Sequence, residues 1–456
     1  MAVYSIVKLS ELEGAKRIDA EYYKPEYLNL LYRLRKAGCV PAKDIAIPVR
    51  RKFKPKKGEY FDYIEISEVD LITGEFNTSR IIGEEAPDRA QWIVVKDDVL
   101  VSTVRPIRNA VVLIREGKEN LVCSSGFSIL HPQKIQANYL FLYFKNSFVA
   151  RLLDRYTTAT EYPAVGWNDI LNMPIYLGNE GFRKKISLTI DKAFVLLKQS
   201  RSLYSQAENL LLEELGLKDF KPAYKKTYTA NLSDAFSAHR INAEYFQPAY
   251  EEILSIISKK HNLVPVKKVF DFRRGIFIPT DFYTEQKTNR PYIRIKELTG
   301  KIGIDESKVI FVNYEYPEND IDKLCENDLV IAIIGDTIGK TNRIPNELAG
   351  GFCSNNTGRL RIKPEIKEKF LPEFAEILFQ SLVVQKQIEK KKAQTGQPKI
   401  SDSDIKSLKI PILPFETQQK IASLVRQSHE ARKKAIALLD EAKRRVEEEI
   451  ENQAAL

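Results

Sequence analysis

Three residues in the first half of this 456-residue chain could form the metal site of an enzyme. Asp88, Glu116 and Lys118 provide two carboxylates and a lysine, the set with which many nucleases hold a divalent ion. Such catalysis needs both carboxylates to converge on one ion, and the second half of the chain has no equivalent set. A DNA nuclease is therefore an alternative hypothesis, and incubating the purified chain with DNA and magnesium tests it.

A second stretch, GDTIGKT at residues 335–341, resembles a phosphate-binding loop. That loop needs four residues between its glycines, whereas here there are three, and the counterpart RPIRNAV at 105–111 has no glycine. The chain also lacks an Asn-Pro-Pro-Tyr or Asp-Pro-Pro-Tyr string and a glycine-rich strand-to-helix turn, which an adenine methyltransferase would use to bind S-adenosylmethionine. We therefore nominate no catalytic residue and expect no cofactor in this chain.

The four cysteines and four histidines are scattered without metal-ligand or disulfide spacing. No metal site is expected, and the cysteines suit a reducing cytosol. The longest apolar runs, such as LVIAII at 329–334, are far shorter than the roughly 20 residues that cross a bilayer. No apolar signal segment opens the sequence. We expect a cytoplasmic protein with no membrane partner.

The basic residues point to a polyanionic partner. The formal net charge is +10, and in RRKFKPKK, residues 50–57, six of eight residues are basic and none is acidic. Arginine forks read base edges in the major groove, and lysines suit phosphates. The DNA-binding candidates in the first half are Arg50, Arg51, Lys52, Lys54, Lys56, Lys57, Arg105 and Arg108. Those in the second half are Arg273, Arg274, Arg290, Lys340, Arg343 and Lys399.

The segments that carry these residues occur twice in the sequence. RIDAEYYKPEY at 17–27 returns as RINAEYFQPAY at 240–250, with seven of eleven positions identical. Pro25 and Pro248 fit the first position of a helix in each copy, and Gly38 and Asn262 fit its end. The predicted buried faces are Tyr27, Leu30, Leu31 and Leu34 in one copy and Tyr250, Ile253, Leu254 and Ile257 in the other. A duplicated structural unit follows.

Sequence that is typical of β-strands follows both predicted opening helices. Residues that alternate between apolar and polar, or that form β-rich runs after an acidic turn, predict half-buried strands. The matched pairs are YIEISEV at 63–69 with YIRIKEL at 292–298, KDDVLVST at 96–103 with ENDLVIAI at 326–333, and CSSGF at 123–127 with CSNNT at 353–357. The separation between matched elements grows along the chain, which indicates an insertion in one copy.

Each copy closes with a long helical segment whose apolar or small residues repeat with 4-3-4-3 spacing. The first seam is Ile186, Ile190, Ala193, Leu197, Ser200, Tyr204, Ala207 and Leu211. The second is Ile421, Val425, Ser428, Arg432, Ala435, Leu439, Ala442 and Val446. This spacing is typical of a coiled coil, and the long stem of Arg432 could reach the edge of the seam. The alternative is that each helix packs only on its own domain.

The whole pattern resembles the specificity subunits of type I restriction-modification systems. Residues 395–425, TGQPKISDSDIKSLKIPILPFETQQKIASLV, are similar to the approach to the family's closing helix. The counterpart at 160–190 diverges, with Glu161 and Tyr162 in place of Gly396 and Gln397. The resemblance covers almost the whole chain.

The resemblance implies a non-catalytic chain that recognises a specific sequence in double-stranded DNA. Each target-recognition domain would read one half of a split sequence, and the paired helices would set the spacing and dock two modification subunits. Those methyltransferase partners would carry S-adenosylmethionine and methylate adenine. Separate restriction subunits, the motor and nuclease, would use ATP and Mg to cleave unmodified DNA.

We therefore predict an α+β fold, with two pseudo-repeated mixed α/β target-recognition domains separated by a pair of long antiparallel coiled-coil helices. The predicted boundaries are 1–180 and 218–415 for the domains, with helices at 181–217 and 416–456. From Ile186 to Leu211 the helix spans about 38 Å, close to one duplex turn of about 34 Å. A third hypothesis, a coiled-coil scaffold that never touches DNA, predicts weak DNA binding without steep salt dependence.

Overall fold

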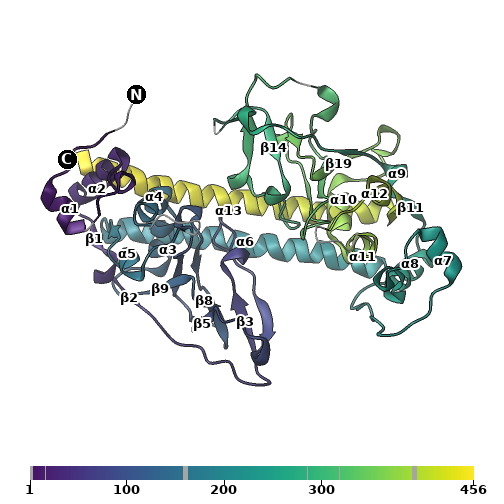
Figure 1. The fold of residues 1–456 in the computed structure, drawn as a ribbon, viewed down its shortest axis with the longest axis horizontal. Coiled ribbons are helices and arrows are strands. Elements are labelled where there is room, and N and C mark those ends of the chain that lie inside the picture. The colour runs from purple at the N-terminus through teal and green to yellow at the C-terminus, as the bar shows by residue number, and fades with distance from the viewer. Residues whose placement is uncertain are drawn as a thin grey trace. The chain divides into compact units, whose positions relative to one another are not determined.

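The computed structural model describes residues 4–15, 17–157, 163–284, 286–317, 319–392 and 398–455. The chain divides into unit 1, Met1–Leu196 with Lys433–Leu456, and unit 2, Leu197–Arg432. The two long helices are α6 (Glu180–Glu214) and α13 (Phe415–Ala455), and each has one part in unit 1 and the other part in unit 2 (Figure 1). Within the described residues, no helix is long and apolar enough to span a bilayer.

Unit 1 contains two four-stranded sheets. The first is antiparallel throughout, in the order β2-β9-β6-β7, and the second has the order β4-β3-β8-β5 with β3 and β8 parallel. The strands of unit 1 are β1 (Val40–Pro41), β2 (Ala46–Pro48), β3 (Tyr60–Ile64), β4 (Ser79–Ile82), β5 (Ala90–Ile93), β6 (Val99–Ser102), β7 (Val111–Leu113), β8 (Leu121–Ser124), β9 (Phe127–Pro132) and β10 (Pro174–Ile175).

The short helices of unit 1 join these sheets to the first half of α6. They are α1 (Leu9–Ala15), α2 (Pro25–Lys36), α3 (Ala137–Lys145), α4 (Ser147–Arg155) and α5 (Trp167–Leu171). Helix α3 is largely buried because it lies between sheet and long helix: Phe141 packs on Phe194 of α6, with ring centroids 5.6 Å apart. The ion pair of Arg115 with Asp191, at 2.7 Å, ties the end of β7 to the same helix.

Unit 2 repeats this topology. The order β12-β19-β16-β17 matches β2-β9-β6-β7, and the parallel pair β14-β18 matches β3-β8. The outer strand differs, because β13 lies beside β15 whereas β5 lies beside β8. The strands are β11 (Leu263–Pro265), β12 (Phe270–Arg274), β13 (Tyr283–Thr284), β14 (Pro291–Ile293), β15 (Ile310–Val312), β16 (Leu329–Ala332), β17 (Thr341–Arg343), β18 (Phe352–Cys353), β19 (Thr357–Ile362) and β20 (Lys409–Pro411). The predicted duplication is confirmed.

The helices of unit 2 follow the same plan. They are α7 (Leu232–Ala238), α8 (Pro248–Ser258), α9 (Val266–Val269), α10 (Pro372–Gln380), α11 (Leu382–Lys391) and α12 (Asp402–Ser407). Pro25 and Pro248 begin α2 and α8 as predicted. The prediction that Asn262 ends the second helix was wrong: α8 ends at Ser258, because the next amides turn back onto Ile256 and Ile257 and the chain then enters β11.

The predicted strands at 63–69 and 292–298 are strands only in their first residues. Both copies leave the ladder at the same place and form a 3-10 turn, at Ile66–Glu68 and Ile295–Glu297. In the second copy the buried carboxylate of Glu297 accepts the backbone N–H of Arg294 at 2.5 Å. A local side-chain bond to the backbone of this kind competes with strand pairing, and alternation of residue types does not reveal it.

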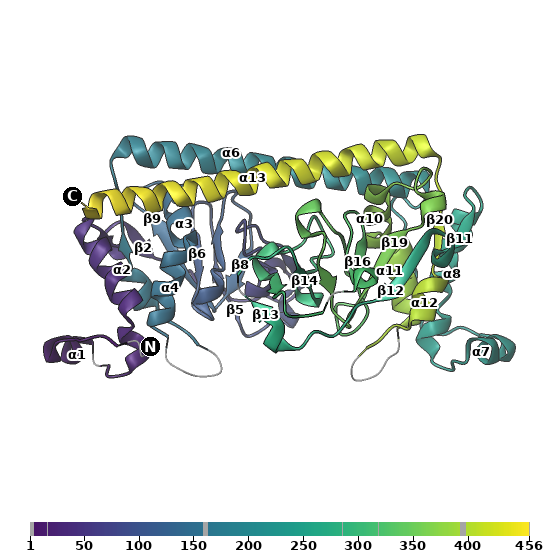
Figure 2. The same cartoon turned by 90° about the horizontal axis from the view of Figure 1, so that it is seen from above.

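The long helices pack against each other in both units (Figures 1 and 2). In unit 1, Ile186 and Ile190 of α6 and Leu439 and Val446 of α13 are buried where the two helices lie side by side. In unit 2, Leu197, Ala207 and Leu211 of α6 are buried, as are Ile421 and Val425 of α13.

Two serines fix the helix contact inside unit 2. The hydroxyls of Ser200 and Ser428 each donate to the other's backbone carbonyl at 2.8 Å. Further along α6, Leu211 joins the same core as Ile421, which precedes Ser428, so the helices run antiparallel. Both serines are buried and satisfied, so the small polar residues of the predicted seam allow close approach without an unpaired hydroxyl.

Candidate nucleic-acid interface

The most basic stretch, residues 50–57, forms the loop between β2 and β3 in unit 1 (Figure 1). Its exposed cations are Arg50, Lys52, Lys54, Lys56 and Lys57. Lys56 lies 3.3 Å from Glu59, and both side chains are more than half exposed, so this ion pair contributes little. A strip of solvated cations can approach a phosphate backbone without losing strong contacts inside the protein.

Arg50 and Arg51 are neighbours with different environments. The guanidinium of Arg50 lies 4.5 Å from the ring centre of Trp167, a cation–π contact that orients an exposed fork. The Nη1 of Arg51 is 2.6 Å from the fully buried carboxylate of Asp98, which also contacts His131 at 2.9 Å. Arg51 therefore holds the base of the loop.

The loop between β6 and β7 presents Arg108. Arg105 and Asn109 flank it with left-handed backbone, φ +47° and +57°, a conformation that surrounding contacts must stabilise. The Asn109 amide donates to the Lys145 carbonyl at 2.8 Å, and the buried Lys145 ammonium donates to the Asn109 carbonyl at 2.9 Å. Arg108 is exposed at the tip of this fixed loop.

The equivalent loop of unit 2 is GDTIGKT, between β16 and β17. Gly335 and Gly339 have φ of +85° and +91°, and a Cβ at Gly339 would lie 2.6 Å from Gln385. The Gly335 amide donates to the Pro398 carbonyl at 2.9 Å, as the Arg105 amide does to Pro163 at 2.7 Å in unit 1. The glycines serve a tight turn, and Lys340 and Lys399 are exposed beside it.

Arg273 and Arg274 end β12 in unit 2. Arg274 pairs with Asp402 at 2.7 Å and Arg273 lies 3.6 Å from Asp322, yet both guanidinium side chains are more than two-fifths exposed. Phe277 follows them with 68% of its surface exposed. An exposed ring in a basic loop suits stacking on a base. Sequence reasoning did not single out Phe277, although RRGIF places it three residues after two arginines.

Arg290 and Arg343, also candidates from the sequence, are buried or nearly so. Arg290 is 1% exposed and donates to the backbone carbonyls of Asn313 at 2.6 Å and Tyr316 at 2.8 Å. Arg343 donates to Glu376 at 3.0 Å. Their forks are occupied inside the protein, so in this structure they support the surrounding loops.

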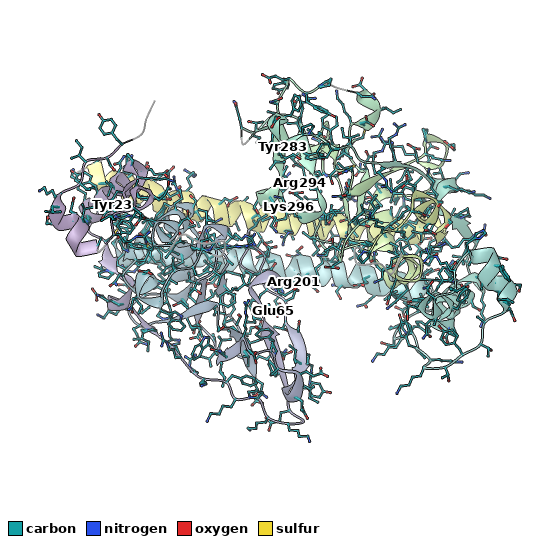
Figure 3. All side chains as sticks on the ribbon, in the orientation of Figure 1. Tyr23, Glu65, Arg201, Tyr283, Arg294 and Lys296 are labelled. Carbon is teal, nitrogen blue, oxygen red and sulfur yellow. The ribbon has the colours of Figure 1, made fainter. Side chains whose placement is uncertain are left out.

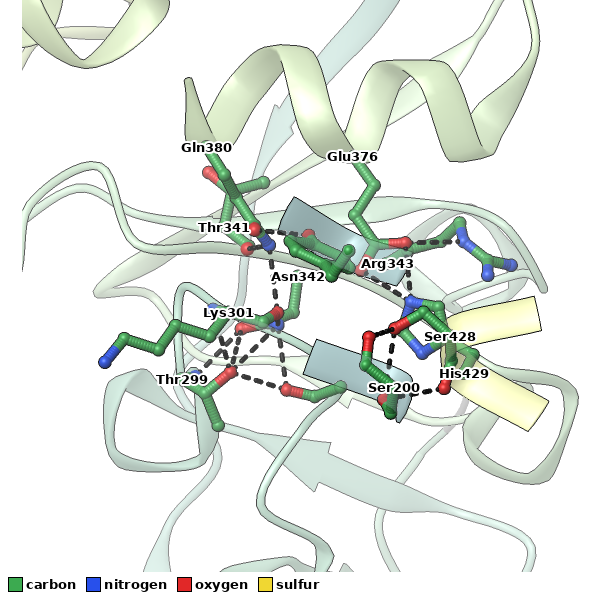
Figure 4. A network of polar contacts seen from close by, with 12 residues as sticks. Ser200, Thr299, Lys301, Thr341, Asn342, Arg343, Glu376, Gln380, Ser428 and His429 are labelled. Atoms are coloured by element: carbon green, nitrogen blue, oxygen red, sulfur yellow. Dashed lines mark hydrogen bonds and ion pairs between the residues drawn. The ribbon is translucent and has the colours of Figure 1, made fainter. Parts of the chain in front are cut away.

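Figure 4 shows how unit 2 fixes a further exposed lysine. The buried Asn342 accepts the amides of Thr299 and Gly300 at 2.8 and 3.0 Å, and donates to the carbonyls of Lys301 and Gly303 at 2.8 Å. Lys301 is thereby held at the tip of a turn whose backbone groups are satisfied. Nothing in the sequence marks Lys301, because the asparagine that anchors it is far away in the chain.

A buried ionic network joins this loop region to α13. His429 lies 3.0 Å from the fully buried carboxylate of Glu376, which Arg343 also contacts (Figure 4). Burial opposes ionisation of Glu376, but the charges of His429 and Arg343 outweigh it and lower its pKa below the ordinary value. The ring of Tyr204 on α6 packs on His429, with centroids 6.4 Å apart. Ion pairs thus connect the sheet edge at β17 to α13, and the ring contact of Tyr204 with His429 extends this link to α6 within unit 2.

The two units differ in charge at matching positions. Glu65 follows β3 in unit 1, and Arg294 follows β14 in unit 2 (Figure 3). Glu65 is exposed, whereas Arg294 pairs with Glu297 at 2.7 Å and donates to the Lys308 carbonyl at 3.0 Å. The same backbone position therefore carries side chains of opposite charge in the two units.

The comparison with known proteins identifies unit 2. Residues 258–437 match the family of the Type I restriction modification DNA specificity domain. Most of unit 2 is therefore similar to a type I DNA specificity domain. This is a family of specificity subunits, which have no catalytic activity of their own. The matched residues run from β11 to the first half of α13 and contain both sheets of unit 2.

Two solved specificity subunits are similar to the chain. The HsdS subunit from Thermoanaerobacter tengcongensis is 18% identical with a TM-score of 0.33, over 91% of this chain and 95% of that one. The S subunit of the type I system of M. genitalium is 13% identical with a TM-score of 0.40, over 91% and 94%. No curated protein matches the chain.

The residues of the nuclease alternative have other contacts. Lys118 of the proposed set pairs with Asp62 at 2.7 Å. Among the residues that the structure describes, no group of three histidine, cysteine, aspartate or glutamate side chains could hold a metal ion. Residues 158–162 and 393–397, which include Glu161, Tyr162, Gly396 and Gln397 from the motif comparison, lie outside the described residues.

Proposed function

We propose that the chain reads a bipartite DNA sequence in a type I restriction-modification system, each unit reading one half. The observation that carries the proposal is the duplication. The specificity domain that matches residues 258–437 has a counterpart in unit 1, with the same strand order in the antiparallel sheet and the same parallel pair in the other sheet. One domain of this kind recognises DNA, so two suit a split target.

Each unit offers cations on loops that the sheets hold in place. In unit 1 these are the exposed residues of 50–57 with Arg108, and in unit 2 they are Arg273, Arg274, Lys340 and Lys399. Phosphate contacts set the register of the protein on the duplex, and forked arginines with bidentate geometry distinguish guanine. The exposed cations differ in position between the two units, which supports different half-sequences.

The long helices would set the distance between the half-sequences and dock two modification subunits. Those partners would supply S-adenosylmethionine and methylate adenine, and restriction subunits would supply ATP, Mg and cleavage. The chain itself would use no cofactor, and the complex would act on double-stranded DNA in the cytoplasm. Linking two readers multiplies their specificities, because the second binding event becomes intramolecular.

Exchange of one domain tests the proposal. Replacing residues 1–180 by those of a relative, in a strain that expresses the modification subunit, should change one half of the methylated sequence and leave the other half intact. The cut at residue 180 keeps the seam of α6 unchanged. Sequencing of methylated adenines in the genome provides the readout, with the parent chain as control. If both halves changed, or neither did, the modular reading would be wrong.

A further inference from the structure

Unit 1 contains a polar cavity of about 550 Å³ beside the first half of α6. Cavities that bind small molecules have volumes of about 300–1,000 Å³. The basic residues that line this one are Lys96, Arg115 and His131, and the acidic residues are Asp97 and Asp191. Among the described residues that line the cavity, none is a cation assigned above to DNA. The cavity is therefore a candidate site for a separate ligand.

The N-terminus of α3 lines this cavity. Gln136, Ala137 and Asn138 are the residue before the helix and its first two residues, and all three belong to the cavity wall. The first amides of a helix have no partner within it, and the Gln136 side chain does not cap them. These amides carry partial positive charge, so the group that suits such a helix end is an anion.

Ser187 adds a buried hydroxyl without a partner. The residue lines the cavity from α6 and is 7% exposed. Its Oγ makes no hydrogen bond within the part of the chain that the structure describes. Ser200, on the same helix, is buried but donates to the Ser428 carbonyl. An unpaired buried hydroxyl is unfavourable, and a ligand in the cavity would supply the missing partner of Ser187.

Two basic side chains of the cavity wall are held in place by other residues. Arg115 donates to Asn138 at 3.0 Å and to Asp191 at 2.7 Å, which fixes its guanidinium between α3 and α6. The Nδ1 of His131 is 2.9 Å from the Asp98 carboxylate, which leaves Nε2 as the ring atom for a ligand. A site whose groups are already ordered loses little conformational entropy when it binds.

Unit 2 has different residues at the matching positions. The strand match of 96–103 with 326–333 places Glu326 at the position of Lys96, and the seam of the long helices places Ala422 at the position of Ser187. Unit 2 forms the same antiparallel sheet and buries Ala422 without either polar group. The fold therefore does not require an ammonium or a hydroxyl at these two positions.

We propose that this cavity binds the phosphate group of a small molecule that also has hydroxyl or amino hydrogens, such as a nucleoside monophosphate. The start of α3, Lys96, the Nε2 of His131 and Ser187 hold the phosphate, whose three acceptor oxygens suit several donors. The exposed Asp97, which also lines the cavity, accepts the hydroxyl or amino hydrogens of the ligand. This proposal does not rest on the proposed function.

Isothermal titration calorimetry of the full-length chain tests the site with adenosine monophosphate, inorganic phosphate and adenosine. Adenosine monophosphate should bind once per chain and inorganic phosphate more weakly, whereas adenosine should not bind measurably. Lys96→Ala and Ser187→Ala should each weaken the binding of adenosine monophosphate about tenfold, because each removes one donor to a charged phosphate.

Lys134→Ala is the matched control, because Lys134 is exposed in the same unit and does not line the cavity. It should leave the affinity unchanged. Without ligand, Ser187→Ala should unfold at the parent temperature or above it, since an unpaired hydroxyl is removed. Affinity that is unchanged in Lys96→Ala and Ser187→Ala would overturn the proposal. Absence of adenosine monophosphate binding at millimolar concentration, or equal weakening by Lys134→Ala, would also overturn it.

A short DNA duplex, added as a competitor, distinguishes a small molecule from a phosphate of the DNA backbone. The affinity for adenosine monophosphate should be the same with and without the duplex. Lys96→Ala should bind the duplex as tightly as the parent chain does. Displacement of adenosine monophosphate by the duplex, together with weaker duplex binding by Lys96→Ala, would overturn the proposal, because the phosphate held here would then belong to DNA.

Discussion

Arg108 and Arg51 lie in basic loops of the same unit, yet their contacts give them different tasks. Arg108 is exposed at a loop tip, whereas Arg51 neutralises the buried Asp98. Local sequence predicted both loops from their density of cations. It could not distinguish the two tasks, because Asp98 belongs to another strand region.

Arg108→Ala should weaken DNA binding without affecting stability. Loss of one phosphate contact should lower the slope of log affinity against log salt by about 0.9, and loss of a base contact should weaken binding to the specific sequence alone. Titration of a fluorescent duplex at several salt concentrations measures both effects.

Arg51→Ala is the matched comparison for Arg108→Ala. It should lower the free energy of unfolding by about 1–3 kcal/mol, because the buried Asp98 keeps its other hydrogen bonds but loses its arginine. Equal effects of the two variants on DNA binding, with equal stability, would contradict this division of roles.

The Glu376 network predicts a pH dependence. The pKa of Glu376 in the folded chain is lowered from its ordinary value of 4.5, so the ionised carboxylate contributes stability above that value, and the contribution is lost as the pH falls through the folded pKa. Glu376→Gln should reduce the free energy of unfolding at neutral pH by about 3–5 kcal/mol, since His429 and Arg343 lose their buried partner.

Denaturant unfolding of parent and Glu376→Gln across a pH series measures that difference. The difference should be largest at neutral pH and should shrink under acid conditions. A difference that grew on acidification would contradict the network. Glu416→Gln is a suitable control, because Glu416 is exposed and pairs with Lys420 on the same helix.

At the scale of elements, the seam was predictable and the strands were predictable only in part. The 4-3-4-3 spacing predicted which faces of α6 and α13 are buried, since helical periodicity translates directly into a face. The strands at 63–69 and 292–298 end early because turns form through local bonds such as that of Glu297 to the backbone. Alternation alone carries no signal for such a bond.

Lengthening both α6 and α13 by one heptad should widen the gap between half-sequences. Seven residues add about 10.5 Å of helix, or about three base pairs at 3.4 Å each, and a whole heptad keeps the seam facing its partner. Mapping of methylated adenines measures the gap. Lengthening α6 alone is the control and should lower stability, because Ser200 could no longer meet Ser428. An unchanged gap in the double insertion would show that the helices do not set it.

For the whole molecule, the printed sequence predicted a duplication, and in the structure the antiparallel sheet has the same strand order in each unit. The sequence could not predict which cations are exposed, because Arg290 and Arg343 are held by Asn313, Tyr316 and Glu376, which lie elsewhere in the chain. The unforeseen Lys301 likewise depends on Asn342. A duplication is visible in the amino-acid sequence, whereas the direction of a side chain depends on partners that folding brings together.

Opposite charges at Glu65 and Arg294 on one common frame have an evolutionary consequence. If each unit reads one half-sequence, as proposed, a change in a single copy would alter one half of the recognised sequence, and the untouched copy would still recognise the other half. A new recognised sequence would then need one genetic event, because the fold and the second unit stay unchanged.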